Sequence, residues 1–355
     1  MRVDWLEARD ETPAQRLVRA PLVPAAWLYG AGAWLARAGR ERGWLRRRRL
    51  PLRVVSVGNL GVGGTGKTPF AAWVATSLAR RGHKVALASR GYGRRGREPV
   101  RVVSDGRYVR GSAESAGDEP MWLAGHAQGV PVLVGRDRGL VGLRALSAFG
   151  TGVLVLDDGF QHHRLARDVD LVCFDGAFGL GNGYVLPRGP LREWPSALRR
   201  ADGIVVVDGP LPEGDARRIA ARAPATRQIR VSRRPVSLRP LSGGAAESPD
   251  ALEGVPVGLL TGVARPDAVR RTLAALGARI VAERVFPDHH RYAARDLAGL
   301  VREAALWVTT EKDAVKLVPA WAQGVDLRVL AQALDVEDGG ALLDWLEGRL
   351  AGRAL

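Results

Sequence analysis

Residues 53–69 have the sequence RVVSVGNLGVGGTGKTP, an apolar strand followed by a glycine-rich loop. The phosphate-binding P-loop pattern GxxxxGK[ST] is matched by Gly61, Val62, Gly63, Gly64, Thr65, Gly66, Lys67 and Thr68. Because glycines lack a Cβ, consecutive backbone N–H groups can curl around an anion, and the start of the next helix adds more N–H groups. Lys67 can reach the β- and γ-phosphates, and the Thr68 hydroxyl can bind Mg²⁺. The stretch therefore predicts a chain that binds a nucleoside triphosphate.

The composition is that of a globular protein with an excess of basic residues. The chain has 355 residues, enough for two domains, and 53 Lys and Arg against 37 Asp and Glu give a net charge of +16. Such an excess favours an anionic partner, which is nucleic acid, an acidic membrane surface or a phosphorylated substrate. Cys173 is the only cysteine and lies in an apolar run, which indicates a small core residue. No Cys/His cluster has the spacing of a structural zinc site.

The first 50 residues combine an apolar stretch with a basic cluster. Residues 20–36, APLVPAAWLYGAGAWLA, fall just short of the roughly 20 residues that a membrane-spanning helix needs. Arginines then predominate from position 37 to position 53, opposed only by Glu41. Apolar residues with tryptophans, followed by basic residues, are typical of an element that lies in a membrane interface. The alternatives are a helix packed on the protein's own core and a single membrane span.

From residue 53 onward, short apolar strands alternate with helices. Such strands predict an α/β fold of the P-loop NTPase type, with a parallel sheet covered by helices on both faces. The predicted strands are 53–57, 85–89, 132–134, 153–156, 171–174 and 204–207. The predicted helices include 70–80, 118–125 and 138–148. Ligands of such sheets bind at the carboxyl ends of the strands, where the P-loop lies.

A smaller C-terminal α/β unit is predicted after a region rich in Pro, Gly and Ser. Its strands are expected at 257–260, 279–286, 306–309 and 327–330, and its helices at 266–276, 294–304 and 340–350. We therefore expect four regions along the chain. They are a membrane-associating segment at 1–50, a P-loop domain at 51–232, a linker at 233–254 and the smaller domain at 255–355.

Polar residues follow several of the predicted strands. Asp157 and Asp158 end one strand, where an acid can hold Mg²⁺, although an Asp-Asp-Gly turn can also simply end a strand. His162 is a site candidate because it follows this pair closely. The local sequence of Asp118 favours a helix cap over a proton acceptor in phosphoryl transfer. Arg138 suits either bidentate phosphate binding or a solvated surface.

Together these stretches resemble the tetraacyldisaccharide 4′-kinase family, the lipid A 4′-kinases. In family order, the matching stretches are SVGNLGVGGTGKTP at 56–69, SRGYGR at 89–94, GDEP at 117–120, GRDR at 135–138, DDGFQH at 157–162, GPLRE at 189–193, FPDHH at 286–290 and TTEKDAVKL at 309–317. A P-loop is common to many families, whereas DDGFQH together with SRGYGR is far narrower. The resemblance extends from about residue 20 to residue 320.

The resemblance implies an enzyme of lipid A biosynthesis that uses ATP and Mg²⁺. It would phosphorylate the 4′-hydroxyl of a tetraacylated glucosamine disaccharide 1-phosphate at the cytoplasmic face of the inner membrane, held peripherally or by a single N-terminal anchor. The residues implied in catalysis are Asp118 as the base, His289 as its assistant, and Lys67. The residues implied at the metal are Thr68, Asp157, Asp158 and Glu193. Further active-site residues are implied at Arg138, His162 and Arg192, and no nucleic acid is expected as a partner.

Two other functions stay open on the residues alone. One is a P-loop ATPase or GTPase switch that acts on a membrane or on nucleic acid, which the P-loop and the +16 charge favour. The chain lacks RNP, helix-turn-helix and zinc-finger patterns as well as the NKxD element of GTPases. The other is a soluble kinase for a small sugar, with the N-terminal apolar stretch as core.

Overall fold

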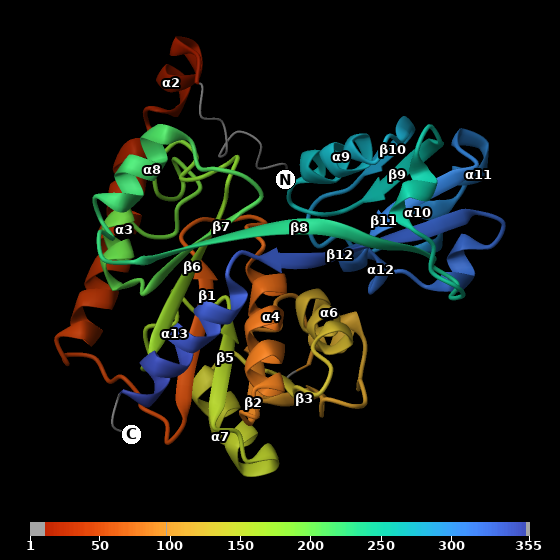
Figure 1. Ribbon diagram of the computed structural model, residues 1–355. Coiled ribbons are helices and arrows are strands. Elements are labelled where there is room, and N and C mark those ends of the chain that lie inside the picture. The colour runs from red at the N-terminus through yellow and green to blue at the C-terminus, as the bar shows by residue number, and fades with distance from the viewer. Residues whose placement is uncertain (1–10, 97, 353–355) are drawn as a thin grey trace.

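The computed structural model describes residues 11–96 and 98–352, which form a sheet of 12 strands with helices around it (Figure 1). The strands are β1 (Arg53–Asn59), β2 (Val85–Ser89), β3 (Arg101–Ser104), β4 (Val132–Val134), β5 (Val153–Asp157), β6 (Val169–Asp175), β7 (Gly203–Val207), β8 (Arg227–Pro240), β9 (Pro256–Thr261), β10 (Arg279–Val285), β11 (Leu306–Thr310) and β12 (Asp326–Val336). Their order across the sheet is β10-β9-β11-β12-β8-β7-β6-β1-β5-β2-β4-β3.

The helices lie between the strands along the chain. They are α2 (Pro13–Arg19), α3 (Leu22–Glu41), α4 (Lys67–Arg80), α5 (Ala113–Ala116), α6 (Asp118–His126), α7 (Arg138–Phe149), α8 (Glu213–Ala220), α9 (Pro266–Ala275), α10 (Ala294–Leu297), α11 (Leu300–Glu303), α12 (Glu311–Ala314) and α13 (Gly339–Ala351). Short 3₁₀ helices are η1 (Pro195–Arg200), η2 (Pro249–Leu252) and η3 (Pro319–Ala322). The helices predicted at 70–80, 118–125 and 138–148 correspond to α4, α6 and α7.

Strand β1 lies in the middle of the P-loop unit, where it pairs in parallel with β5 and β6. Val55 and Val57 pack in one core cluster with α4, α6 and α13, while Val54 packs on the opposite face with α7. Burial on both faces explains why these strands are apolar without alternation. The predicted α/β sheet with helices on both faces is confirmed. Strand β3, which the sequence did not predict, adds an antiparallel edge beside β4.

Helix α3 packs on the P-loop unit with one face and exposes apolar side chains elsewhere. Ala26 is buried in a cluster with β6, β7 and α8, and the Trp27 and Trp194 rings lie 4.9 Å apart. A Cβ on Gly30 would meet the Trp194 indole at 2.4 Å, so only glycine permits this close packing. The exposed apolar side chains of the helix are Trp27, Leu28, Tyr29, Trp34 and Leu35. The helix thus has both a core-facing side and an apolar outer side.

Residues 1–10 of the expected N-terminal segment lie outside the described residues. Between residues 11 and 352, residue 97 aside, no helix has both the length and the apolar character needed to cross a membrane.

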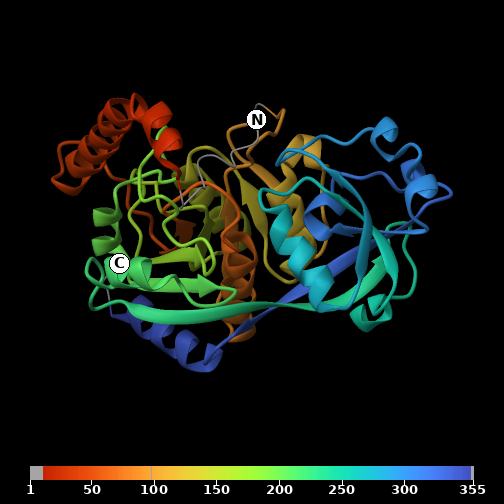
Figure 2. The same ribbon diagram turned by 90° about the horizontal axis from the view of Figure 1, so that it is seen from above.

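Two long antiparallel strands connect the P-loop unit to the smaller unit. Strand β8 starts beside β7 and continues as the partner of β12, which Figures 1 and 2 show as a ribbon running between the two units. The ladder shifts register between Ala331 and Gln332, close to Pro235, which has no N–H to donate to a regular ladder. The prediction of a linker at 233–254 was therefore wrong for residues 233–240, which belong to β8.

The smaller unit is built on the parallel strands β9, β10 and β11, with β12 beside them. Val257 and Leu259 pack in a cluster with α9, whereas Leu260 and Trp307 pack in a second cluster with α10 and α11. Instead of the single helix expected at 294–304, two short helices form. Gly299 lies between them with φ 80°, a left-handed conformation that interrupts the helix.

Helix α13 lies on the P-loop unit and not on the smaller unit. Leu346 is buried in the same core cluster as Phe70 of α4, and Arg81 pairs with Asp344 at 2.5 Å. Strand β12 carries the chain back along β8 to this point. The smaller domain predicted at 255–355 was wrong for this helix. An amphipathic helix sequence does not specify which part of the sheet it covers.

Candidate active site

The P-loop connects the carboxyl end of β1 to α4, which begins at Lys67. Gly66 caps this helix with φ 75°, and a Cβ there would lie 3.0 Å from Val207. Both the backbone conformation and the neighbouring side chain therefore require glycine at this position. Gly63 also has a positive φ, 101°, so the glycines shape the loop as the pattern predicts.

A cavity of about 200 Å³ opens beside the P-loop, between the two units. Its lining from the P-loop unit includes Gly64, Thr65, Gly66, Lys67, Thr68 and Glu119. From the smaller unit and the ribbon, the lining includes Arg233, Val263, Arg265, Thr310, Lys312 and Leu330. Of the predicted cradle, Val62 instead donates its N–H to the Pro190 carbonyl at 2.8 Å. The C-terminal part of the cradle thus faces a pocket of mixed apolar and charged lining, as ligand sites do.

The end of β5 meets the P-loop through a hydroxyl and a carboxylate. The Thr68 hydroxyl donates to Asp157 at 3.1 Å, and the Ser89 hydroxyl donates to the other oxygen of Asp157 at 3.3 Å. Burial, helped by the nearby Glu119 carboxylate, raises the pKa of Asp157 to about 7. In the described part of the chain, the buried Thr65 hydroxyl has no hydrogen-bond partner, which a bound phosphate would supply. This donor set fits Mg²⁺, which takes one or two carboxylates and keeps several waters.

Lys67 is buried among carboxylates at the start of α4. Burial alone would lower its pKa, but three nearby carboxylates outweigh burial and raise the pKa. They belong to Asp158, Glu119 and Asp157. Asp158 accepts hydrogen bonds from Arg192 at 2.9 and 3.0 Å. Although burial opposes it, the charges of Lys67 and Arg192 lower the pKa of Asp158, so the predicted residues form one charged cluster.

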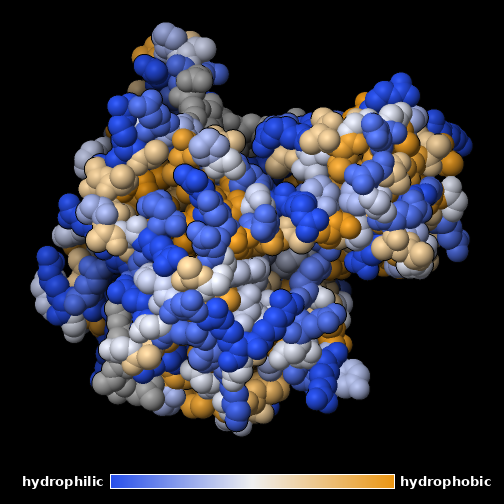
Figure 3. All heavy atoms as spheres, viewed as in Figure 1, coloured by the Kyte–Doolittle hydropathy of each residue, from blue (hydrophilic) through white to orange (hydrophobic). Residues whose placement is uncertain are grey.

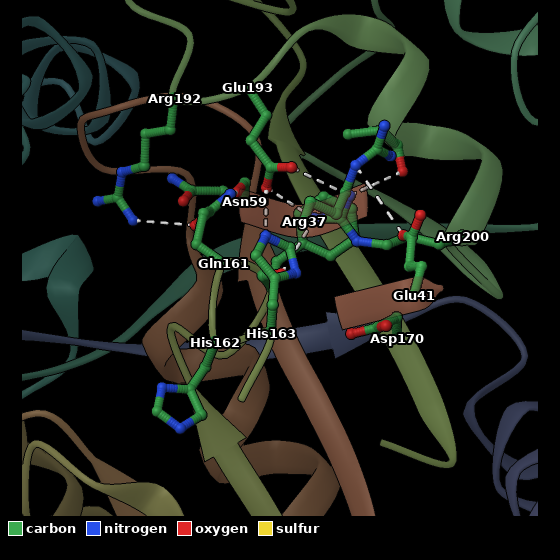
Figure 4. A network of polar contacts seen from close by, with 12 residues as sticks. Arg37, Glu41, Asn59, Gln161, His162, His163, Asp170, Arg192, Glu193 and Arg200 are labelled. Carbon is green, nitrogen blue, oxygen red and sulfur yellow. Dashed lines mark hydrogen bonds and ion pairs between the residues drawn. The ribbon is translucent and has the colours of Figure 1, made fainter. Parts of the chain in front are cut away.

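Glu193 contacts a different set of side chains. It pairs with Arg200 at 2.7 Å and with His163 at 3.5 Å (Figure 4). Burial would raise the pKa of Glu193, but His163 and Arg200 lower it to about 2. Over the described ranges, no three His, Cys, Asp or Glu side chains are grouped to hold a metal ion. Two basic side chains thus engage the Glu193 carboxylate, and its placement at the metal with Asp157 and Asp158 stays a prediction from the resemblance.

His162 and Arg138 belong to the surroundings of the acidic pair. The His162 ring points away from Glu193 in Figure 4. Burial and the charge of Arg138 lower the pKa of His162 to about 4, so this ring is neutral at pH 7. Burial also lowers the pKa of Arg138, which the Asp158 and Asp157 carboxylates counteract. The structure thus places Arg138 within electrostatic range of the acidic pair, and His162 within range of Arg138.

Asp118 and His289 meet although they come from different units. His289 Nδ1 lies 3.2 Å from Asp118 Oδ2, and the Tyr92 ring lies 5.3 Å from the His289 ring. The neighbouring His290 contacts Asp296 at 2.9 Å instead. His289 is therefore the histidine that faces the P-loop unit.

The capping role that the local sequence favoured for Asp118 was wrong. Asp118 is the first residue of α6, and the N-cap is Gly117, which has φ 100° and leaves no side-chain cap. The glycine takes the cap position, so the Asp118 carboxylate points at His289. Glu119 lines the cavity together with Lys67, which places the start of α6 beside the P-loop.

Sequence reasoning assigned no role to several residues that line the cavity. Glu119 and Lys312 lie within the matched stretches GDEP and TTEKDAVKL, so the signal was present in those stretches. Arg233, which pairs with Asp208 at 2.5 Å, lies in the expected linker and had no such signal. Its place in the site follows only from the path of β8.

The chain is similar to known proteins over most of its length. The family model described as tetraacyldisaccharide-1-P 4′-kinase matches residues 18–351. A tetraacyldisaccharide 4′-kinase of Anaeromyxobacter sp. (strain Fw109-5) is 46% identical over 334 residues, which cover 92% of this chain and 89% of the relative. One of Syntrophus aciditrophicus (strain SB) is 41% identical over 332 residues, which cover 87% and 88%.

The fold also matches a solved structure. A crystal structure of LpxK from Aquifex aeolicus in complex with ATP has a TM-score of 0.75 and 29% sequence identity to this chain. The match covers 94% of this chain and 99% of that chain, so both the P-loop unit and the smaller unit are included. Together with the family model, these matches show that the chain belongs to the tetraacyldisaccharide-1-P 4′-kinase family.

Proposed function

We propose that the chain transfers the γ-phosphate of ATP to the 4′-hydroxyl of a tetraacylated glucosamine disaccharide 1-phosphate, a late step of lipid A biosynthesis. Family membership and the ATP bound to the solved relative support this reaction. In this structure, one observation carries the proposal. Asp118 and His289 are in contact at a helix start beside the P-loop cavity, where a hydroxyl nucleophile needs a proton acceptor.

The P-loop side of the site serves to hold and neutralise phosphate. Phosphoryl transfer passes through a loose transition state, so positioning and charge neutralisation do most of the catalysis. The backbone N–H groups at the start of α4 and the charged Lys67 would hold the β- and γ-phosphates. Mg²⁺, held by Thr68 and Asp157, would neutralise charge on the phosphate oxygens.

The other side of the site serves the acceptor. Asp118 takes the proton of the 4′-hydroxyl while that oxygen bonds to the γ-phosphorus and the bond to ADP breaks. His289 fixes the Asp118 carboxylate through Nδ1 at 3.2 Å. Arg138 and Arg192 supply positive charge next to the acidic pair. Because His289 comes from the smaller unit, this side of the site is complete only while the two units stay together as they do in this structure.

The proposed domain boundaries follow the two units. We propose residues 51–232 as the kinase domain, with α13 packed on it, and the unit that starts near residue 255 as the smaller domain. The ribbon of β8 and β12 joins the two and supplies cavity residues of its own.

We propose that the chain works at the cytoplasmic face of the inner membrane, held there by α3. Leu28 and Leu35 on this helix are 76% and 60% exposed, and with the exposed Trp27, Tyr29 and Trp34 they give one helix an apolar outer side that lipid would cover. The Arg42 guanidinium lies over the rings of Trp34 and Trp44, so a basic group adjoins the apolar outer side of the helix. A substrate with four acyl chains and a phosphate would match this combination.

The alternative of a P-loop switch on nucleic acid is not favoured. The relatives are named as kinases, and the match to the solved relative in complex with ATP covers 94% of this chain. On the face drawn in Figure 3, hydrophilic and hydrophobic side chains are interspersed over both units.

The reaction is tested by incubation of the purified chain with γ-labelled ATP and a tetraacyl disaccharide 1-phosphate, followed by lipid extraction. We expect label in the lipid phase, and a loss of about 100-fold or more in kcat for Asp118→Asn. Label released only as inorganic phosphate would contradict the kinase assignment. Near-normal kcat in Asp118→Asn would remove the proposed base.

Membrane docking is tested by flotation with vesicles of inner-membrane lipid composition. Leu28→Ser is expected to lower binding roughly tenfold, because burying a leucine side chain contributes about 1.5–3 kcal/mol. The matched control is Val301→Ser, an exposed apolar residue of α11 in the smaller unit. Equal binding of both variants and the unmodified chain would count against α3 as the docking element.

A further inference from the structure

The loop after β10 carries two adjacent histidines whose side chains contact different units. The His290 ring stacks on Phe286 at 4.3 Å, and its Nε2 lies 2.9 Å from Asp296, so it is held within the smaller unit. His289 turns the other way and reaches Asp118 of the P-loop unit. A residue that keeps His289 turned in this direction would control the contact with Asp118.

The backbone of His289 is in a conformation that needs support. Its φ is 60°, in the left-handed region, which costs a residue other than glycine roughly 1–2 kcal/mol. The Asp288 carboxylate accepts a hydrogen bond from the His289 backbone N–H at 3.1 Å. Asp288 therefore holds the strained backbone from which the imidazole projects.

The same carboxylate also faces the His289 ring. Asp288 Oδ2 lies 3.6 Å from His289 Nε2, an ion-pair distance, while Asp118 lies 3.2 Å from Nδ1. The ring thus has a carboxylate at each of its nitrogens.

Lys312 holds Asp288 in turn. Its Nζ donates to Asp288 Oδ1 at 3.2 Å, and Lys312 lines the P-loop cavity together with Lys67 and Glu119. Burial would raise the pKa of Asp288, but Lys312 and His289 lower it, which keeps the carboxylate ionised. A chain of polar contacts therefore runs from Lys312 at the cavity wall through Asp288 and His289 to Asp118.

We propose that Asp288 is a positioning residue of the phosphoryl transfer, which orients the backbone and ring of His289 toward Asp118 and is itself held by Lys312. This inference rests on the roles proposed above for Asp118 and His289. The competing interpretation is an ion pair that only ties the β10 loop to α12. The two differ in whether the effect of Asp288 passes through His289.

The test is a double-mutant cycle with steady-state kinetics on ATP and the lipid disaccharide. Asp288→Asn is expected to lower kcat about 10- to 100-fold and to leave the KM for ATP within about twofold, because a misplaced catalytic group costs about that much. In a His289→Ala background, the same substitution is expected to change kcat by less than about twofold, since the group it positions is gone. The matched control is Glu283→Gln. Glu283 is a carboxylate of β10 whose partner is Arg270, at 2.7 Å, and neither residue belongs to the proposed site.

A second readout follows the ring directly. The NMR shifts of the His289 ring nitrogens are expected to change in Asp288→Asn and in Lys312→Met, and not in Glu283→Gln. If Asp288→Asn does not fold, Lys312→Met carries the kinetic test with the same expected cycle. Equal losses with and without His289, or unchanged kcat in Asp288→Asn, would overturn the proposal. Full activity of His289→Ala would instead refute the role proposed for that histidine, so the two failures are distinguishable.

Discussion

Replacing Glu193 with glutamine removes one negative charge from the buried cluster that also contains Arg200 and His163. These partners lower the pKa of Glu193 from 4.5 to about 2 against the opposing effect of burial. A shift of about 2.5 units at about 1.36 kcal/mol per unit corresponds to about 3 kcal/mol of folding stability. Burial lowers the pKa of both Arg200 and His163, and the substitution would leave both buried without this carboxylate, so about 3 kcal/mol or more is the expected loss.

The sign of the pH dependence follows from the direction of that shift. The folded state favours the ionised form of Glu193, so the contribution is complete above the unfolded pKa of 4.5 and disappears as the pH falls toward 2. The difference in unfolding free energy between the unmodified chain and Glu193→Gln is therefore expected to be about 1 kcal/mol smaller at pH 3.5 than at pH 7.5. Urea unfolding followed by circular dichroism at both pH values measures this difference.

The control and the refuting result separate a structural role from a metal role. Glu213→Gln removes a carboxylate from an exposed pair with Arg217 on α8 and is expected to change stability by less than about 0.5 kcal/mol. If Glu193→Gln unfolds at the same urea concentration as the unmodified chain while its Mg²⁺ affinity falls tenfold, our reasoning is wrong. Glu193 would then be a metal ligand, as the family resemblance implied.

Three further outcomes are expected. Leu346→Ala should lower the free energy of unfolding by about 3 kcal/mol, because this side chain is fully buried in the P-loop unit core; an unchanged urea midpoint would contradict that packing. Gly66→Ala should weaken the binding of a fluorescent ATP analogue at least tenfold, because of its φ of 75° and the Val207 contact at 3.0 Å; normal affinity would show that the loop adapts. Thr68→Val should raise the Mg²⁺ concentration needed for half-maximal activity while leaving the thermal unfolding temperature within a few degrees, and an unchanged Mg²⁺ requirement would remove Thr68 from the metal site.

The sequence by itself determined those parts of the protein whose cause is local. The apolar strand and glycine loop at 53–69 predict the P-loop because its phosphate cradle is made by consecutive backbone groups. The continuous apolar strands predict a parallel sheet with two covered faces because burial on both sides leaves no polar alternation. The resemblance of eight short stretches added the family, and it added the site residues that we propose.

The tertiary structure alone decided which of these residues meet. Asp118 and His289 are 171 positions apart, and nothing in either local sequence specifies a contact of 3.2 Å between them. Glu193 is close in sequence to Arg192, yet its carboxylate pairs with Arg200 and His163. The physical reason is that side-chain partners and helix placement depend on long-range packing of the whole sheet, including the ribbon that brings α13 back to the P-loop unit.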